Sequence, residues 1–359
     1  MSDRHDWILP LTSAGLLVLA FLTPFPPANA LLFVPVLVWL ERSPDADARA
    51  RFRGMLRFTV PAYAVARYWV WAMWSISWLA SLMWLGLIVL FAVPNAAALA
   101  VAAWMRRAAG WSWGVVLPVC WLPVEWVRTF GDLRMTADHI AYGVAKYPFF
   151  CQFAVVVGAY GVGAVVLATN GLLADVWLGG GRRRWTGVAS LVILLGAVLG
   201  YDAWAWHRWA EPVEETVRVA IVQPNVAVDT KNDLSTSVEQ LRTLNRLTFE
   251  AADRGAELIV WPETARPEPM YHWVDIPGTY RLPEISPVAR TLGVAMLIGS
   301  EYGQVRTEDD YDFYNAAFAV HPDGIVDPVW AAKSYLVPFV EKTPLEALLG
   351  RLVRGKGGD

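Results

Sequence analysis

Long apolar runs fill the chain from residue 7 to residue 206 and are rare beyond it. The 359-residue sequence is 56% hydrophobic and only 18% charged, which is too apolar for an ordinary soluble protein. The apolar region also holds 16 of the 20 tryptophans. Because a transmembrane helix needs about 20 largely apolar residues, this asymmetry predicts a multi-pass α-helical membrane domain over residues 1–206. Residues 207–359 then form a separate globular domain.

The apolar runs have lengths that fit about seven transmembrane helices. We expect spans at residues 7–22, 30–40, 58–104 (two spans with a turn near 77–81), 111–126, 149–178 and 185–206. Arginines cluster between them, with five in residues 41–57, a pair at 106–107 and three at 182–184. Since loops rich in arginine stay on the cytoplasmic side, the domain after residue 206 is expected on the external side of the membrane.

Charged side chains are scarce inside the predicted spans, where Arg67, Asp175 and Asp202 are the main ones. Glu125 lies at the end of one span beside Arg128, and we expect a local ion pair there rather than a functional site. The scarcity of charge and the lack of evident inverted repeats argue against a transporter. An anchor needs only one helix, so several spans indicate a lateral cavity or a lipid-facing binding surface.

The remaining composition limits the chemistry of the chain. A net charge of −3 gives no reason to expect a nucleic-acid partner. Cys120 and Cys151 are the only cysteines, and both lie in apolar surroundings. We therefore expect neither a disulfide framework nor a metal site, and no cofactor.

From residue 216 onward, strand-length apolar runs alternate with amphipathic helices. We expect one helix from a cap at Asp233 or Ser235 to Arg254, and a shorter helix near residues 287–292. The expected strands cover residues 217–222 (a buried strand), 258–261, 294–299, 315–320 and 326–332. A helix alternating with strands, followed by a strand-turn-strand unit, predicts an α/β layered sandwich.

Two of these strands end at a charged side chain. Pro262 cannot donate a ladder hydrogen bond, so it ends the run 258–261 and leaves Glu263 at the strand end. Lys333 follows the run 326–332 in the same way. The fragment around Glu263 by itself is more typical of a solvated loop glutamate. With the second strand end beside it, we expect a site in which Glu263 and Lys333 approach within about 4 to 6 Å.

The residues around these two strand ends resemble the carbon-nitrogen hydrolase (nitrilase) superfamily. One motif is Trp261-Pro262-Glu263, and the other is Lys333 followed by Leu336-Val337-Pro338-Phe339 and Glu341. The fusion to several spans is similar to one branch, the apolipoprotein N-acyltransferase family. Further strings that carry this resemblance lie at residues 118–128, 158–161, 170–173, 223–225, 314–315 and 344–346.

The resemblance implies a fold and an activity. The globular domain would be a nitrilase-like αββα sandwich, and the membrane would be the bacterial inner membrane with the catalytic domain on its periplasmic side. The reaction would move a fatty acyl group from a membrane phospholipid to the α-amine of the N-terminal diacylglyceryl-cysteine of an apolipoprotein. The partners are thus a phospholipid acyl donor and a diacylated apolipoprotein acceptor, with a cysteine acyl-enzyme between them.

The resemblance also gives roles to three residues. Glu263 would be the general base that activates the cysteine thiol, and Lys333 would stabilise the oxyanion of the tetrahedral intermediate. Glu341 would orient Lys333, although a plain loop carboxylate is an equal alternative. Tyr314 and Asn315 are read as no more than a strand start.

The sequence departs from the family pattern at its C-terminal end. The family has a cysteine nucleophile and a final span beyond the lysine, whereas this chain ends at Asp359 and has no cysteine in residues 207–359. We therefore expect the globular domain to be C-terminally incomplete and the chain as written to be inactive. The alternatives are a catalytically dead remnant that binds lipid or protein, and a membrane-tethered nitrilase-type amidase.

Overall fold

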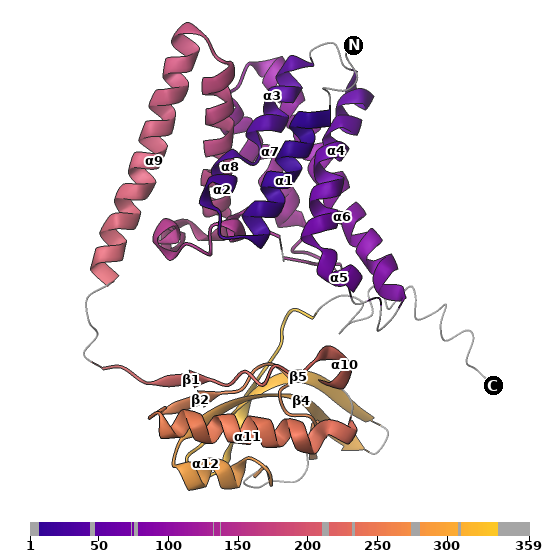
Figure 1. Ribbon diagram of the computed structural model, residues 1–359, viewed down its shortest axis with the longest axis vertical. Coiled ribbons are helices and arrows are strands. Elements are labelled where there is room, and N and C mark those ends of the chain that lie inside the picture. The colour runs from indigo at the N-terminus through magenta and orange to yellow at the C-terminus, as the bar shows by residue number, and fades with distance from the viewer. Residues whose placement is uncertain are drawn as a thin grey trace, which may run out of the picture. The chain divides into compact units, whose positions relative to one another are not determined.

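The computed structural model describes residues 7–336, apart from residues 44–46, 73, 75–77, 132, 137, 210–214, 232–233, 274–280 and 308–309. The chain divides between its last long helix and its first strand into two compact units, each with its own hydrophobic core (Figure 1). We call them the helical unit and the sheet unit. A helical N-terminal part followed by a domain of strands and helices was predicted from the sequence, and the structure confirms it.

The helical unit consists of helices that run alongside one another (Figure 1). In chain order they are α1 (Ile8–Leu22), α2 (Pro26–Leu31), α3 (Val34–Arg42), α4 (Ala48–Ala66), α5 (Tyr68–Ala72), α6 (Leu79–Ala109), α7 (Trp113–Val127), the 3₁₀ turns η3 (Ile140–Gly143) and η4 (Pro148–Cys151), α8 (Ala154–Leu178) and α9 (Gly181–Trp209).

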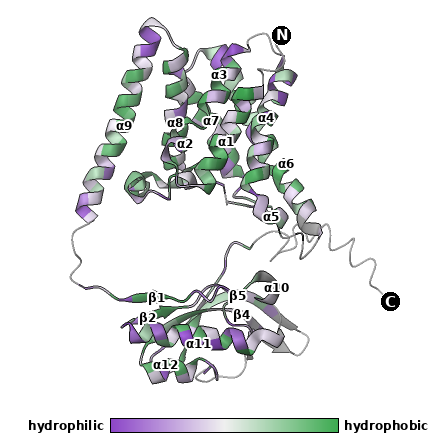
Figure 2. Ribbon diagram, in the orientation of Figure 1, coloured by the Kyte–Doolittle hydropathy of each residue, from purple (hydrophilic) through white to green (hydrophobic). Residues whose placement is uncertain are grey.

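Three helices in the described part of the chain are long and apolar enough to cross a membrane: Ser81–Ala109 within α6, Ala154–Leu178 and Gly181–Trp209. The helices α1 and α7 are apolar but shorter. Apolar residues predominate along α6, α8 and α9, and polar residues gather at the ends of α9 (Figure 2). The expected count of about seven spans stays a prediction.

The three arginine clusters that were expected between the spans lie on helices instead, and the pair at 106–107 belongs to α6. The helix α4 begins at Ala48, inside the expected loop 41–57, and α9 begins at Gly181, before the arginines at 182–184. Arginine is a good helix former. The start of α4 is also capped, because the Asp47 carboxylate accepts a hydrogen bond from the Ala50 amide at 2.6 Å. Local propensity and a cap thus extend the helices beyond their apolar runs.

A buried asparagine joins the first helices to α8. The Asn170 side-chain oxygen accepts a hydrogen bond from the Phe33 amide at 2.9 Å, and its nitrogen donates to the Asn29 carbonyl at 2.8 Å. Phe33 also packs edge-on against Trp121 of α7, with ring centroids 4.7 Å apart. These contacts explain why the turn between α2 and α3 sits in the centre of the core of the helical unit.

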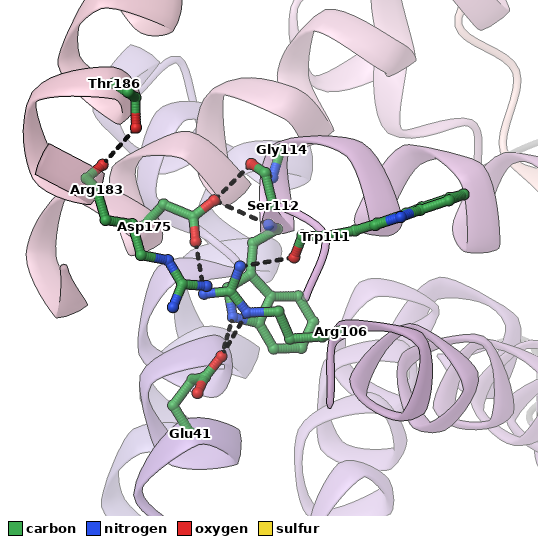
Figure 3. A network of polar contacts seen from close by, with 9 residues as sticks. Glu41, Arg106, Trp111, Ser112, Gly114, Asp175, Arg183 and Thr186 are labelled. Carbon is green, nitrogen blue, oxygen red and sulfur yellow. Dashed lines mark hydrogen bonds and ion pairs between the residues drawn. The ribbon is translucent and has the colours of Figure 1, made fainter. Parts of the chain in front are cut away.

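A second polar network joins the C-terminal ends of α3, α6 and α8 to the start of α7 (Figure 3). Arg106 is buried and forms ion pairs of 2.8 Å with Glu41 and with Asp175. The other Asp175 oxygen accepts hydrogen bonds from the Ser112 hydroxyl at 2.6 Å and the Trp113 amide at 2.8 Å. One arginine therefore links two carboxylates from two helices, and Asp175 also satisfies amide and hydroxyl donors at the start of α7.

The local ion pair expected for Glu125 beside Arg128 was wrong, because Glu125 has other partners. Its carboxylate lies 3.1 Å from the His139 ring and accepts hydrogen bonds from the Trp121 indole at 2.9 Å and the Ile140 amide at 3.0 Å. The Arg128 guanidinium instead stacks over the Phe91 ring at 4.4 Å. The sequence suggested Arg128 because it is three residues away, whereas the donors from residues 139–140 approach only after the chain folds back.

The described residues of the sheet unit form a six-stranded mixed sheet. Its elements are β1 (Val219–Ile221), α10 (Val228–Lys231), η5 (Leu234–Thr236), α11 (Ser237–Asp253), β2 (Leu258–Val260), β3 (Met270–Trp273), α12 (Ser286–Leu292), β4 (Ala295–Thr307), β5 (Asp310–Val320) and β6 (Val326–Ala332). The strand order is β1-β2-β4-β5-β6, and β3 pairs with the far part of β4. The pairs β1-β2 and β2-β4 are parallel, whereas β4-β5 and β5-β6 are antiparallel.

Side chains alternate between the two faces of this sheet. Ile259, Met296 and Phe318 belong to one core with Leu244 of α11 and Ala289 of α12. The opposite face carries apolar residues that are exposed among the described residues: Val219, Ile221 and Leu297. The four-layer αββα sandwich would cover that face with a second sheet, and it stays a prediction.

Several details of the sheet unit differ from the expectations. The strand expected to be buried at 217–222 is the edge strand β1, and its Ile221 side chain is 76% exposed. The long hairpin of β4 and β5, and the short β3, extend the sheet beyond the expected strands. Ser235 lies in η5, and the N-cap of α11 is Thr236, whose side chain makes no capping hydrogen bond. Asp233 lies outside the described residues.

Candidate active site

The strand β2 is fixed where it ends, so the residues after it have a defined position. Trp261 is 2% exposed, its amide donates to the Leu297 carbonyl at 2.8 Å, and its indole donates to the Thr248 hydroxyl at 2.9 Å. Pro262 follows and has no amide hydrogen to continue the ladder. The motif thus anchors Trp261 in the core and places Glu263, two residues later, at the surface.

The turn after β2 packs closely against β4. A Cβ atom on Gly299 would lie 2.3 Å from the Pro262 carbonyl oxygen, so only glycine allows this approach. The Ala265 amide donates to the Gly299 carbonyl at 3.0 Å. Thr264, between them, has φ of 46°, in the left-handed region that threonine rarely adopts.

The strand β6 brings Lys333 to the same edge of the sheet. Since β4 is parallel to β2, and β6 follows β4 after two antiparallel steps, the carboxyl ends of β2 and β6 point the same way. Such ends are where α/β sheets gather their functional groups. The Lys333 amide still donates to the Asn315 carbonyl of β5 at 2.8 Å, which sets the position of the lysine along the strand.

Three side chains meet at this edge. The Lys333 ammonium lies 2.8 Å from Oε1 of Glu263, and the Asn315 side-chain amide donates to the same oxygen at 2.5 Å. The expected approach of Glu263 and Lys333 is therefore confirmed. The Glu263 side chain is 56% exposed and the Lys333 side chain 28%, so the carboxylate is open to a substrate while the ammonium is partly covered.

Asn315 is the site residue that the sequence reasoning missed. It was read as the start of a strand, whereas β5 starts at Asp310 and Asn315 lies inside it. An asparagine within a strand between aromatic and small residues was the available signal, because asparagine is depleted in strands. Its side chain points to the sheet face of Ala317, opposite to the core face of Phe318.

The arrangement has the parts of a base and an oxyanion site. A carboxylate can take a proton from a nucleophile, and a fixed ammonium and amide beside it can stabilise developing negative charge. The ion pair is partly exposed, so its contribution to stability is small, and stability gives little reason for it. Glu341, the third expected residue, lies outside the described residues.

Neither cysteine belongs to the sheet unit. The Cys120 thiol lies 3.5 Å from the Met105 sulfur between α6 and α7. The Cys151 thiol contacts the Tyr147 and Pro148 carbonyls at 3.6 and 3.5 Å within η4 and the turn before it. Both contacts are internal to the helical unit.

Two family models match this chain. Residues 13–172 match the one described as apolipoprotein N-acyltransferase N-terminal domain, and residues 218–357 match the one described as carbon-nitrogen hydrolase. The second match contains both Glu263 and Lys333.

Similar curated proteins are each named apolipoprotein N-acyltransferase. A protein from Geobacter metallireducens is 27% identical over 99% of this chain and 68% of its own length. One from Methylococcus capsulatus is 30% identical over 95% of this chain and 65% of its own length, and one from Brucella suis 30% over 88% and 61%. The chain thus spans about two thirds of the length of these relatives.

Proposed function

This chain belongs to the apolipoprotein N-acyltransferase family, and on that basis we propose that it forms the membrane part and the base-bearing part of an acyltransferase. The acyl donor is a membrane phospholipid, and the acceptor is the α-amine of an N-terminal diacylglyceryl-cysteine on an apolipoprotein. The observation that carries the proposal is the 2.8 Å contact between Glu263 and Lys333, with Asn315 on the same carboxylate oxygen.

The first half-reaction forms an acyl-enzyme. Glu263 takes the proton of a cysteine thiol, and the thiolate attacks the ester carbonyl of the phospholipid. Lys333 stabilises the oxyanion of the tetrahedral intermediate. When the carbon–oxygen bond breaks, Glu263 returns the proton to the leaving oxygen, and a lysophospholipid departs from the thioester.

The second half-reaction transfers the acyl group. The neutral α-amine of the acceptor attacks the thioester carbonyl, and Lys333 again stabilises the oxyanion. Glu263 accepts a proton from the attacking nitrogen, the carbon–sulfur bond breaks, and the thiolate takes the proton back. An amide bond has formed and the thiol is regenerated.

The thiol in this scheme does not come from residues 207–359, which contain no cysteine. The proposal therefore concerns the complete product of the gene that encodes residues 1–359. In that product, Glu341 would orient Lys333.

The helical unit would cross the bacterial inner membrane several times and hold the lipid substrates. Only 11% of the apolar window of α9 is buried, so most of its valine, leucine and tryptophan side chains face its surroundings. Such a surface is suited to hydrocarbon and costs free energy in water. The sheet unit would lie on the periplasmic side.

Reporter fusions test this orientation. Alkaline phosphatase fused after Arg184, which retains the arginines at 182–184, is expected to be inactive, because these arginines keep the turn between α8 and α9 in the cytoplasm. The same reporter after Glu215, beyond α9, is expected to be active. A fusion at 215 that is inactive although the protein is made would contradict the orientation.

An acyl-transfer assay tests the function. The purified gene product is incubated with a phospholipid whose fatty acyl chains carry a stable isotope and with a diacylated peptide that begins with cysteine. Mass spectrometry is expected to find the labelled acyl group on the peptide α-amine. An otherwise identical peptide with an acetylated α-amine is the control and should gain no label. Hydrolysis of a small amide without any transfer to the peptide would instead support a membrane-tethered amidase.

A further inference from the structure

A second lysine contacts the residues around Glu263 from another direction. Lys231 is the last residue of α10, and its ammonium donates to the Thr264 hydroxyl at 2.7 Å and lies 3.4 Å from the Glu263 carbonyl oxygen. It approaches the backbone of the turn, whereas Lys333 approaches the Glu263 carboxylate. The two lysines thus hold different parts of the same segment.

The segment that Lys231 contacts is conformationally costly. A left-handed backbone is unfavourable for an L residue, and branching at Cβ makes threonine one of the least tolerant residues. Thr264, with φ of 46°, persists only if its surroundings hold it there. The hydrogen bond from the Ala265 amide to the Gly299 carbonyl constrains one side of the turn, and the Lys231 ammonium constrains the other.

Lys231 is itself fixed in place through α11. The Gln240 side-chain amide donates to the Thr230 carbonyl at 3.0 Å and to the Lys231 carbonyl at 3.4 Å, and it also donates to the Thr236 hydroxyl at 2.8 Å. Gln240 is 7% exposed, so these bonds are shielded from water. The backbone of Lys231 therefore has a defined distance to Thr264, which its side chain bridges.

We propose that Lys231 is a positioning residue, which holds the turn at Glu263 and Thr264 in its left-handed conformation and thereby keeps the Glu263 carboxylate against Lys333. The inference rests on the role of Glu263 as general base. Lys231 acts on the turn and does not touch the reacting atoms. A lysine there for solubility would need no such partners, since an exposed ammonium is well solvated without any protein contact.

Hydrogen exchange tests the positioning without reference to activity. In the complete gene product, Lys231→Met removes the ammonium but keeps most of the aliphatic stem. The amides of residues 264–266 should exchange about tenfold faster, because the open states of the turn become more populated. Arg242→Met is the matched control, since Arg242 is an exposed cation on α11 whose loss should leave these amides unchanged. Unchanged exchange in Lys231→Met would overturn the proposal.

The kinetics of the variants separate positioning from general structure. Lys231→Met should lower kcat about 10- to 100-fold, since small displacements of a catalytic group have effects of this size, while KM for phospholipid changes little. Lys231→Arg, which keeps a donor, should recover most of the rate. Thr264→Val should lose as much as Lys231→Met, and the double variant should lose no more, because both remove one contact.

A glycine variant provides an independent check. Glycine adopts positive φ without strain, so adding Thr264→Gly to Lys231→Met should restore part of the rate, about several-fold. If the fold-losses in kcat of Lys231→Met and Thr264→Val multiply in the double variant, the two side chains act independently and the proposal is overturned. If the unaltered gene product transfers no acyl group at all, the proposed function fails, whereas the exchange experiment still decides the role of Lys231.

Discussion

Replacing Lys333 by methionine in the complete gene product is expected to lower the rate of acyl transfer by about 100- to 1,000-fold, the usual effect of removing one oxyanion donor. The Lys333 ammonium lies 2.8 Å from the Glu263 carboxylate. Methionine keeps most of the length of the side chain and removes the charge and the hydrogen-bond donors. The rate is measured as the initial transfer of labelled acyl groups to the diacylated peptide.

The stability of the folded state should change little in this variant. A partly exposed ion pair contributes at most about 1 kcal/mol, so the thermal unfolding of Lys333→Met should stay close to that of the unaltered protein. A loss of rate with unchanged unfolding assigns the effect to the reaction. A variant that retains at least half of the rate would remove Lys333 from the mechanism.

The second large effect is expected in the helical unit, where Arg106→Met should destabilise the fold by about 3–5 kcal/mol. Arg106 is 6% exposed and pairs with both Glu41 and Asp175, so its removal leaves two carboxylates without their cation (Figure 3). The measurement is thermal unfolding of the purified protein in one fixed detergent.

The next residue on the same helix is the matched control. Arg107 is exposed, and Arg107→Met should change the stability little. The double variant Arg106→Met/Asp175→Asn should be more stable than Arg106→Met alone, because it removes a buried charge that has lost its partner and keeps an acceptor oxygen for the Ser112 hydroxyl and the Trp113 amide. Equal losses from Arg106→Met and Arg107→Met would show that the network is not a determinant of stability.

The two strand ends of the site were predictable because a single local rule governs each. Pro262 ends β2 whatever the rest of the chain does, and this places Glu263 at a strand end. Lys333 follows an apolar run of strand length, and parallel strands end at one edge of a sheet. Their 2.8 Å contact follows from these two facts together with the strand order.

Asn315 and Lys231 were not predictable in the same way. Asn315 contacts Glu263 through the register of β4 and β5, which depends on pairs far apart in the sequence. Lys231 belongs to a four-residue helix that has no hydrophobic period, and its partner lies 33 residues away. Both roles arise from tertiary packing, which local propensity does not report.

The helical unit shows the same limit. Its apolar runs located the helices, but a run does not say where a helix begins when arginines and a capping aspartate extend it, as at Asp47 and Ala48. The partner of Glu125 was misjudged because the nearest arginine in sequence was preferred over His139, which the folded chain brings to 3.1 Å. The partners of a buried charged residue depend on which residues the fold brings near it, whereas the sequence shows only which residues are close along the chain.

The central claim is that Glu263 and Lys333 form the base and the oxyanion site of an acyltransferase, and the acyl-enzyme tests it most directly. The complete gene product is incubated with a defined phospholipid and no acceptor, and its intact mass is recorded before and after treatment with hydroxylamine, which cleaves thioesters. The unaltered protein should gain the mass of one acyl group and lose it on treatment. Glu263→Gln, which keeps the size of the side chain but cannot take a proton, should gain none. An adduct that forms in Glu263→Gln at the rate of the unaltered protein would contradict the assignment.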